Sequence, residues 1–174
     1  MRTAALTLTS VLVLGLAACS GPAQPAKETA AEATPAAPAA APAPAVVTLP
    51  VVDTATVQAR LTPDNTLEVL TFAPAGTTTA SGEIKGYKAP VYAVPVAAGQ
   101  TLVVAFKSAN TSLYMNVTDA ADASGAAVHR GEVDGPNATL TAAKDTTYLL
   151  QPFMVRAAAR RGESGPFEIT VTRK

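Results

Sequence analysis

Three arginines within six residues carry the most distinctive chemistry of this chain: Arg156, Arg160 and Arg161. A guanidinium group stays charged at physiological pH and binds a carboxylate through two parallel hydrogen bonds. If the alanines between them form one helical turn, Arg156 and Arg160 project from the same side at an i, i+4 spacing. The segment then suits a partner that carries carboxylates. The alternative is that Arg160 or Arg161 pairs with Glu163 or caps strand carbonyls, and the sequence leaves both open.

Cys19 is the only cysteine of the chain, and its position indicates a covalent modification. It follows a basic start and a mostly apolar stretch, residues 4–16, that is too short to span a bilayer as a permanent helix. We expect residues 1–18 to be a lipoprotein signal peptide and the Cys19 thiol to carry the lipid. Ser20 resembles the residue found there in lipoproteins sorted to the outer membrane, which predicts an anchor on its periplasmic face in a bacterial envelope. An ordinary secretory signal with an incidental cysteine is the alternative.

Residues 19–46 consist mainly of alanine and proline and differ in composition from the remainder. Prolines withhold backbone donors and favour an extended conformation, so we expect a disordered Ala/Pro-rich tether. Residues 47–174 then form the folded domain. The balance of 13 basic and 13 acidic residues argues against a nucleic-acid partner. No later stretch approaches the roughly 20 consecutive apolar residues of a second membrane span.

The domain shows short β-type runs separated by turns, with no convincing amphipathic helix. We predict an all-β fold, a small antiparallel β-sandwich of eight or nine strands. Residues 56–61 and 67–72 flank a Pro-Asp-Asn turn and are expected to form a hairpin. The other strand candidates are residues 81–87, 91–96, 101–107, 112–117, 128–133, 138–141, 147–154 and 167–172.

Alternation of apolar and polar residues predicts which side chains enter the core. Three of the candidate strands show it clearly, and their expected inward residues are Leu102, Val104 and Phe106; Leu113, Met115 and Val117; and Phe167, Ile169 and Val171. Tyr114 and Asn116 are expected to face outward.

Motifs of enzymes are absent from the sequence: there is no HExxH, no Gly-x-Ser-x-Gly elbow and no phosphate-binding glycine loop. His129, beside Arg130, is predicted to lie on the surface. The chain is therefore predicted to be no enzyme and to need neither cofactor nor metal. One loose group of oxygen-bearing side chains could hold Ca²⁺, but its spacing matches no calcium motif and favours turn residues. Its members are Asp119, Asp122, Glu132, Asp134 and Asn137.

Several segments together resemble a known family. They are Ser81-Gly82-Glu83-Ile84-Lys85-Gly86-Tyr87, Val91-Tyr92, Gly99-Gln100-Thr101 and Arg156-x-x-Ala159-Arg160. From about Leu67 to the C-terminus, their order and spacing resemble the periplasmic inhibitors of g-type (goose-type) lysozyme. The resemblance implies a small β-sandwich that inserts loops into the active-site cleft of a lysozyme. It also implies that Arg156 and Arg160 are among the inhibitory residues.

A lysozyme cleft suits such arginines because glycoside cleavage uses a pair of carboxyl groups. Tyr87, Tyr92 and Tyr114 are candidate partner contacts, although each is equally compatible with a half-buried place in the sandwich. Two features depart from the family: the lipid anchor, and Arg161-Gly162-Glu163 directly after the paired arginines. The alternative function is a non-catalytic lipoprotein that binds carbohydrate or peptidoglycan.

Overall fold

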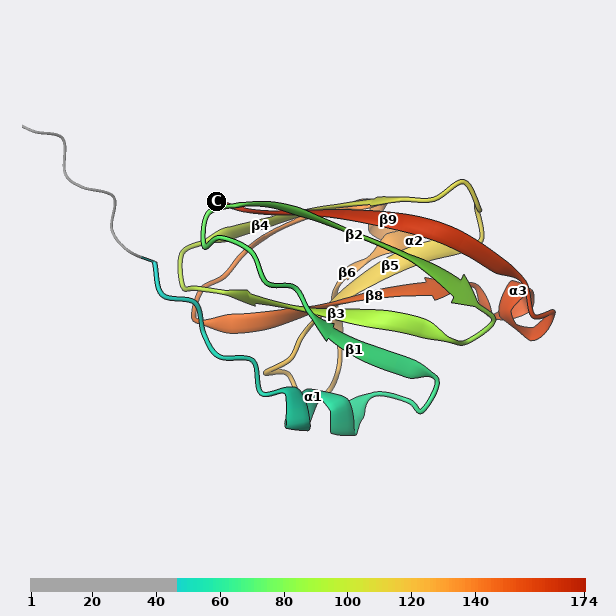
Figure 1. Ribbon diagram of the computed structural model, residues 1–174, viewed down its shortest axis with the longest axis horizontal. Coiled ribbons are helices and arrows are strands. Elements are labelled where there is room, and N and C mark those ends of the chain that lie inside the picture. The colour runs from blue at the N-terminus through green and yellow to red at the C-terminus, as the bar shows by residue number, and fades with distance from the viewer. Residues whose placement is uncertain (1–46) are drawn as a thin grey trace, which may run out of the picture. The chain divides into compact units, whose positions relative to one another are not determined.

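The structure, a computed structural model, describes residues 47–174. The predicted signal peptide, Cys19 and the predicted tether of residues 19–46 lie outside the described residues. Within residues 47–174, nine strands form two sheets that pack face to face, which confirms the predicted all-β sandwich (Figure 1). Among the helices of this part of the chain, none has the length and apolar character needed to cross a membrane.

The larger sheet has five strands in the order β1-β3-β8-β5-β6, and the smaller sheet has four in the order β2-β9-β4-β7. All neighbouring strands are antiparallel except β1 and β3, which run parallel. In the larger sheet the bounds are β1 (Asn65–Val69), β3 (Ala89–Val96), β8 (Thr146–Met154), β5 (Leu113–Asp119) and β6 (Ala127–Arg130). In the smaller sheet they are β2 (Gly76–Lys85), β9 (Ser164–Arg173), β4 (Thr101–Lys107) and β7 (Asn137–Thr141).

The core between the sheets is built from the alternating residues of β4, β5 and β9. Every inward residue predicted on these three strands is buried, with 8% of Phe106 as the largest exposed fraction. Tyr114 and Asn116 are partly exposed and face outward, also as predicted. Strands with a period of two thus fix the register of the sandwich, because a slip of one residue would turn the apolar side chains to solvent.

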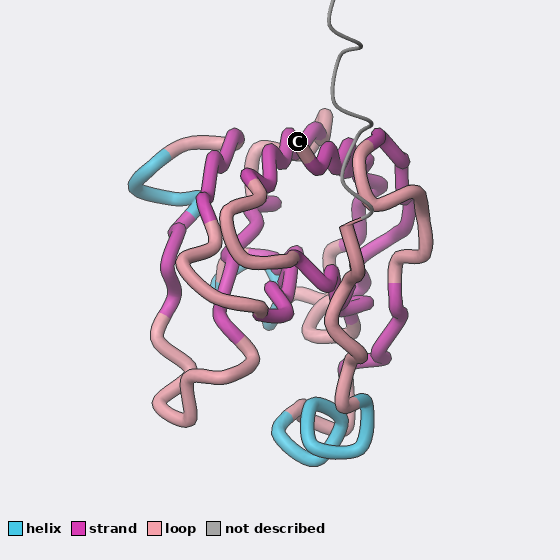
Figure 2. The backbone as a smooth tube through the Cα atoms, turned by 90° about the vertical axis from the view of Figure 1, so that its left-hand side faces the viewer, coloured by secondary structure: helices cyan, strands magenta, loops and turns pink. Residues whose placement is uncertain are grey.

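The first predicted strand, residues 56–61, is wrong: the chain forms the helix α1 (Thr54–Arg60) there. Asp53 caps this helix, because its carboxylate accepts hydrogen bonds from the backbone N–H and hydroxyl of Thr56 at 3.0 and 2.6 Å. Val57 is buried on the outer face of the larger sheet, in a cluster with Val91 and Leu149. Figure 2 shows α1 as a separate turn of helix outside the strands.

The predicted hairpin of residues 56–61 and 67–72 is therefore wrong as well, since β1 pairs in parallel with β3. The candidate strand of residues 128–133 is interrupted by the short helix α2 (Gly131–Asp134). Gly131 explains the interruption. A Cβ at this position would lie 2.5 Å from the backbone oxygen of Met115, so only glycine allows this close approach.

Candidate functional site

Helix α3 (Arg156–Arg160) joins β8 to β9 at one end of the sandwich (Figure 1). Two of its three alanines face inward: Ala158 is fully buried and Ala159 is 5% exposed. Arg156 and Arg160 are exposed on the other side. The helical turn that the alanines suggested is therefore present, and it carries one arginine at each end.

The turn between β2 and β3 packs against α3 and is hydrogen-bonded to the loop that follows it. The backbone N–H of Gly86 donates to the carbonyl of Glu163 at 2.8 Å. Gly86 has a φ of 59°, and a Cβ there would lie 3.3 Å from the carbonyl oxygen of Ala159. Glycine thus provides both the left-handed backbone and the room for α3 to dock. The short helix is held against the scaffold although it has only five residues.

The same turn contributes charge and an aromatic ring. Lys85, Tyr87 and Lys88 are all exposed, with 52% of Tyr87 accessible. We call these three residues, together with Arg156 and Arg160, the basic end of the sandwich. Within residues 47–174, the side chains of Arg156 and Arg160 make no hydrogen bond or ion pair, so both guanidinium groups remain available to a partner.

Arg161 follows the alternative that the sequence left open. Its guanidinium donates to Glu163 from Nε at 2.7 Å, and its Nη2 lies 2.6 Å from the same carboxylate oxygen. The two side chains are 62% and 39% exposed, so this ion pair is well solvated. The pair bridges the turn that ends α3, where Gly162 has a φ of 71°. Arg161 therefore belongs to the loop's own structure, unlike Arg156 and Arg160.

The three candidate tyrosines lie in different places. Tyr87 belongs to the basic end. Tyr92 is 2% exposed and packs edge-on against Phe167 in the core, and burial raises the pKa of its phenol. It therefore offers no surface to a partner. Tyr114 is half-buried on the outer face of the larger sheet, where its ring lies 6.0 Å from that of Phe153.

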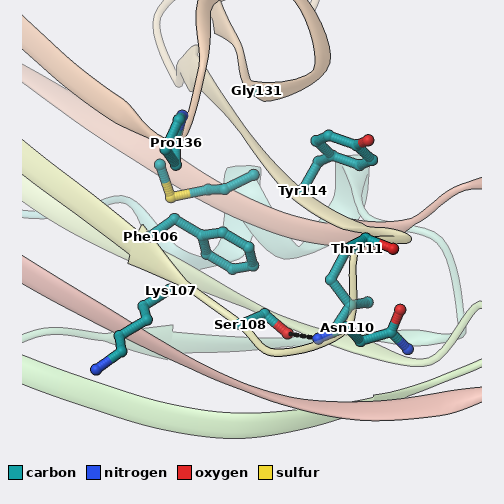
Figure 3. Close-up of a pocket in the computed structure, with 10 residues that line it drawn as sticks. Phe106, Lys107, Ser108, Asn110, Thr111, Tyr114, Gly131 and Pro136 are labelled. Atoms are coloured by element: carbon teal, nitrogen blue, oxygen red, sulfur yellow. Dashed lines mark hydrogen bonds between the residues drawn. The ribbon is translucent and has the colours of Figure 1, made fainter.

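Two hollows open near these residues. One, of about 410 Å³, lies at the edge between the sheets, with Phe106 and Pro136 beside the 108–111 loop (Figure 3). It contains no residue of α3 or of the β2–β3 turn. The other, of about 320 Å³, reaches Tyr87 at the basic end and continues over the outer face of β8 and β5.

Several solved structures are similar to this chain. PliG of Aeromonas hydrophila, a periplasmic inhibitor of g-type lysozyme, superposes with a TM-score of 0.56 and 28% identity, over 63% of this chain and 97% of that chain. The chain is structurally similar to PliG. A mutant of PliG from Escherichia coli has a TM-score of 0.48 and 20% identity, over 63% of this chain and 98% of that chain. PliG of Salmonella Typhimurium has a TM-score of 0.47 and 22% identity, over 65% of this chain and 100% of that chain. No protein-family model and no curated protein sequence matches the chain.

The similarity to PliG agrees with the resemblance drawn from the sequence segments. The match spans almost the whole length of the Aeromonas PliG chain. It includes neither a lipid anchor nor a role for any single side chain, so the assignment of residues rests on the geometry of the basic end.

Three members of the oxygen-bearing group that was weighed for Ca²⁺, Asp119, Asp122 and Asp134, are engaged in local hydrogen bonds. Asp119 accepts hydrogen bonds from Ala121 N–H and from the Thr146 hydroxyl, and Asp122 accepts from Ser124. The Asp134 carboxylate accepts from the N–H of Arg130. Among residues 47–174 no cluster of three metal-binding side chains occurs. These contacts support the turn-residue interpretation.

His129 differs from its prediction. The residue is 7% exposed, so the expectation of a surface histidine is wrong. Its Nε2 lies 2.9 Å from the carbonyl oxygen of Gly135, which ties β6 to the connection that leads to β7. The inward direction of His129 follows from its pairing with the buried Val117 of β5.

Arg173 is a buried charged residue that the motif analysis missed. It is 1% exposed, and its guanidinium donates to the carbonyls of Pro95 and Phe72 at 2.8 and 2.7 Å. The guanidinium carbon also lies 3.7 Å from the centre of the Phe72 ring. Burial lowers the pKa of this group. A signal was available, because Arg173 continues the inward period of Phe167, Ile169 and Val171.

Proposed function

We propose that this protein is a non-enzymatic inhibitor of g-type lysozyme and that the basic end is its inhibitory surface. The observation that carries the proposal is the pair of exposed guanidinium groups, Arg156 and Arg160, without partners in residues 47–174, on a fold similar to that of PliG. A lysozyme cleft holds the carboxyl groups that glycoside cleavage requires. Those groups are the natural acceptors for two arginines.

The proposed mechanism is occlusion of the cleft. The helical turn fixes the backbone between Arg156 and Arg160, so that binding needs to order only the two side chains and not the loop itself. Tyr87 adds a broad, rigid contact beside them, as aromatic residues do at the centre of protein interfaces. Lys85 and Lys88 extend the positive surface, which speeds encounter with an acidic groove.

The proposed location is the cell envelope. Cys19 would carry the lipid, and residues 19–46 would hold the domain away from the membrane at about 3.1 Å per residue if extended. Ser20 supports delivery to the periplasmic face of the outer membrane. Replacement of Cys19 by alanine is expected to release the protein from the membrane fraction. Retention in that fraction would contradict lipidation at this residue.

Inhibition of purified goose-type lysozyme tests the function, with hen-type lysozyme as the specificity control. We expect selective inhibition by the full-length protein and its loss in the double variant Arg156→Ala, Arg160→Ala. The matched control is Arg130→Ala, Lys144→Ala, which also removes two exposed positive charges but lies outside the basic end. Equal loss in both double variants would indicate a general charge effect. Absence of inhibition by the unmodified protein would contradict the proposed function.

A further inference from the structure

A groove on the outer face of the larger sheet has a different chemistry from the basic end. It has a volume of about 320 Å³. Helix α1 covers the neighbouring part of the same face, where Val57, Val91 and Leu149 cluster. The groove begins where this cover ends. Its lining combines two aromatic rings and three amides with the carboxylate of Asp64 and several apolar residues. The aromatic and amide residues are Tyr87, Phe153, Asn65, Asn116 and Gln151.

Two successive cross-strand pairs lie on this face of the sheet. Tyr114 of β5 lies opposite Phe153 of β8, and Asn116 lies opposite Gln151. Phe153, Asn116 and Gln151 line the groove, whereas Tyr114 does not. Met115 and Leu150 point into the core, so the alternation of each strand turns these pairs outward. The two aromatic rings are inclined at 31° to each other. An aromatic surface therefore adjoins a pair of amides.

The amides have hydrogen-bonding groups to spare. The Asn116 Oδ1 accepts from Gly131 N–H at 3.2 Å, which leaves its Nδ2 free. The Gln151 Nε2 donates to the Thr118 hydroxyl at 3.3 Å, which leaves its Oε1 free. Among residues 47–174, Arg173 Nε is the one buried side-chain atom without a partner. The free atoms of Asn116, Gln151 and Asn65 are therefore open to solvent and to a ligand.

We propose that this groove binds a β-linked saccharide. Such sugars have a flat C–H face, which packs on an aromatic ring, and a rim of hydroxyls that both donate and accept hydrogen bonds. Phe153 and Tyr87 supply the rings, and the free amide atoms supply one donor and one acceptor on adjacent strands. The volume lies at the lower end of the range of about 300–1,000 Å³ for small-molecule sites. The site goes beyond lysozyme inhibition, because none of its amides belongs to the basic end.

Titration of the labelled full-length protein with N-acetylglucosamine tetramer, followed by NMR, tests the proposal. A parallel titration with cellotetraose asks whether the acetamido group is recognised. We expect saturable shifts in the side-chain amide signals of Asn116 and Gln151. Gln151→Met keeps the length of the side chain, and Asn65→Ala removes a side chain that bonds to no other described residue. Each is expected to weaken binding roughly tenfold, as loss of a ligand hydrogen bond does.

Thr170→Ala, on the outer face of the other sheet, is the matched control and is expected to bind as the unmodified protein does. Binding of either tetrasaccharide that both groove variants weaken would support the site. The absence of binding to both sugars, or binding that neither groove variant weakens, would overturn it. Lysozyme inhibition by the groove variants is measured in parallel. Because Asn65 and Gln151 lie outside the basic end, failure of saccharide binding with inhibition intact would overturn this inference alone.

Discussion

Arg156 and Arg160 project into solvent from α3 at one end of the sandwich, whereas Arg173 is buried where β9 ends, at the opposite end (Figure 1). Arg173 is surrounded by backbone carbonyls and the Phe72 ring, so its charge is used within the fold. The two arginines of α3 have no such partners among the described residues. The comparison teaches that solvent exposure and free donors, rather than residue type, separate an arginine that is available to a partner from one that is used within the fold.

Arg173→Ala should have the largest effect. The change leaves the carbonyls of Pro95 and Phe72 without their donor and opens space beside the Phe72 ring. We expect the free energy of unfolding to fall by about 3 kcal/mol, measured by urea denaturation. Arg130→Ala is the exposed control and should change it by no more than about 0.5 kcal/mol. If the free energy of unfolding of Arg173→Ala fell by less than about 1 kcal/mol, the conclusion that Arg173 stabilises the fold would be wrong.

The double variant Arg156→Ala, Arg160→Ala tests whether the two exposed arginines of α3 act in binding and not in stability. Its inhibition constant for goose-type lysozyme should rise at least about 100-fold, because two interface arginines would be lost. Its free energy of unfolding should stay within about 0.5 kcal/mol of the unmodified protein, since both side chains are exposed. A large loss of stability without loss of inhibition would mean that these arginines resemble Arg173 after all.

Glu163→Gln sharpens the comparison by freeing Arg161. Exposed ion pairs are worth about 0–1 kcal/mol, so we expect a change in unfolding free energy below about 0.5 kcal/mol. The inhibition constant should change by less than about threefold, because a free-energy change below about 0.5 kcal/mol corresponds to no more than that factor. Measurements at low and high salt would check the origin of the effect. A change that persists at high salt would show that the loop itself had rearranged.

The smallest expected effect concerns α1, far from any arginine of the comparison. Hydrogen bonds from the hydroxyl and N–H of Thr56 lower the pKa of the Asp53 carboxyl below its ordinary 3.8. The cap therefore stabilises α1 above that pH and is lost as the pH falls through the folded-state pKa. The protection factor of the Thr56 N–H, which is its exchange rate relative to that of an unstructured peptide at the same pH, should fall in that range. Asp53→Asn, which caps without ionising, should abolish the acid dependence, and persistence of the dependence in this variant would contradict it.

The architecture was predictable where side chains alternate cleanly. In β4, β5 and β9 the nine inward positions predicted from the alternation hold apolar residues, and all nine are buried. The segment of residues 56–61 was ambiguous, because Val57 and Leu61 satisfy both a period of two and an i, i+4 spacing. The Asp53 cap decides for the helix. The parallel pairing of β1 had no local signal, since it depends on where the chain returns after α1.

The site was predictable only in part. The sequence singled out Arg156, Arg160 and Tyr87, which the structure shows to be exposed. It could not tell Arg161 from its neighbours, because only the folded turn brings Glu163 within reach. Arg173 and His129 were not expected in the core, because the pattern of alternation assigns inward positions to apolar residues. The amide pair of Asn116 and Gln151 comes from strands joined by a long stretch of chain, so register alone brings the two side chains together.

The position of β9 has a consequence for biosynthesis. Among the nine described strands it comes last along the chain, yet it lies between β2 and β4, with which it pairs over ten and six register positions. β2 has no other neighbour in its sheet. The smaller sheet therefore cannot close until β9 has been synthesised, and α3, which directly precedes β9, is held at both of its ends only from that point. Premature termination just before β9 would leave β2 as an unpaired strand exposed to aggregation.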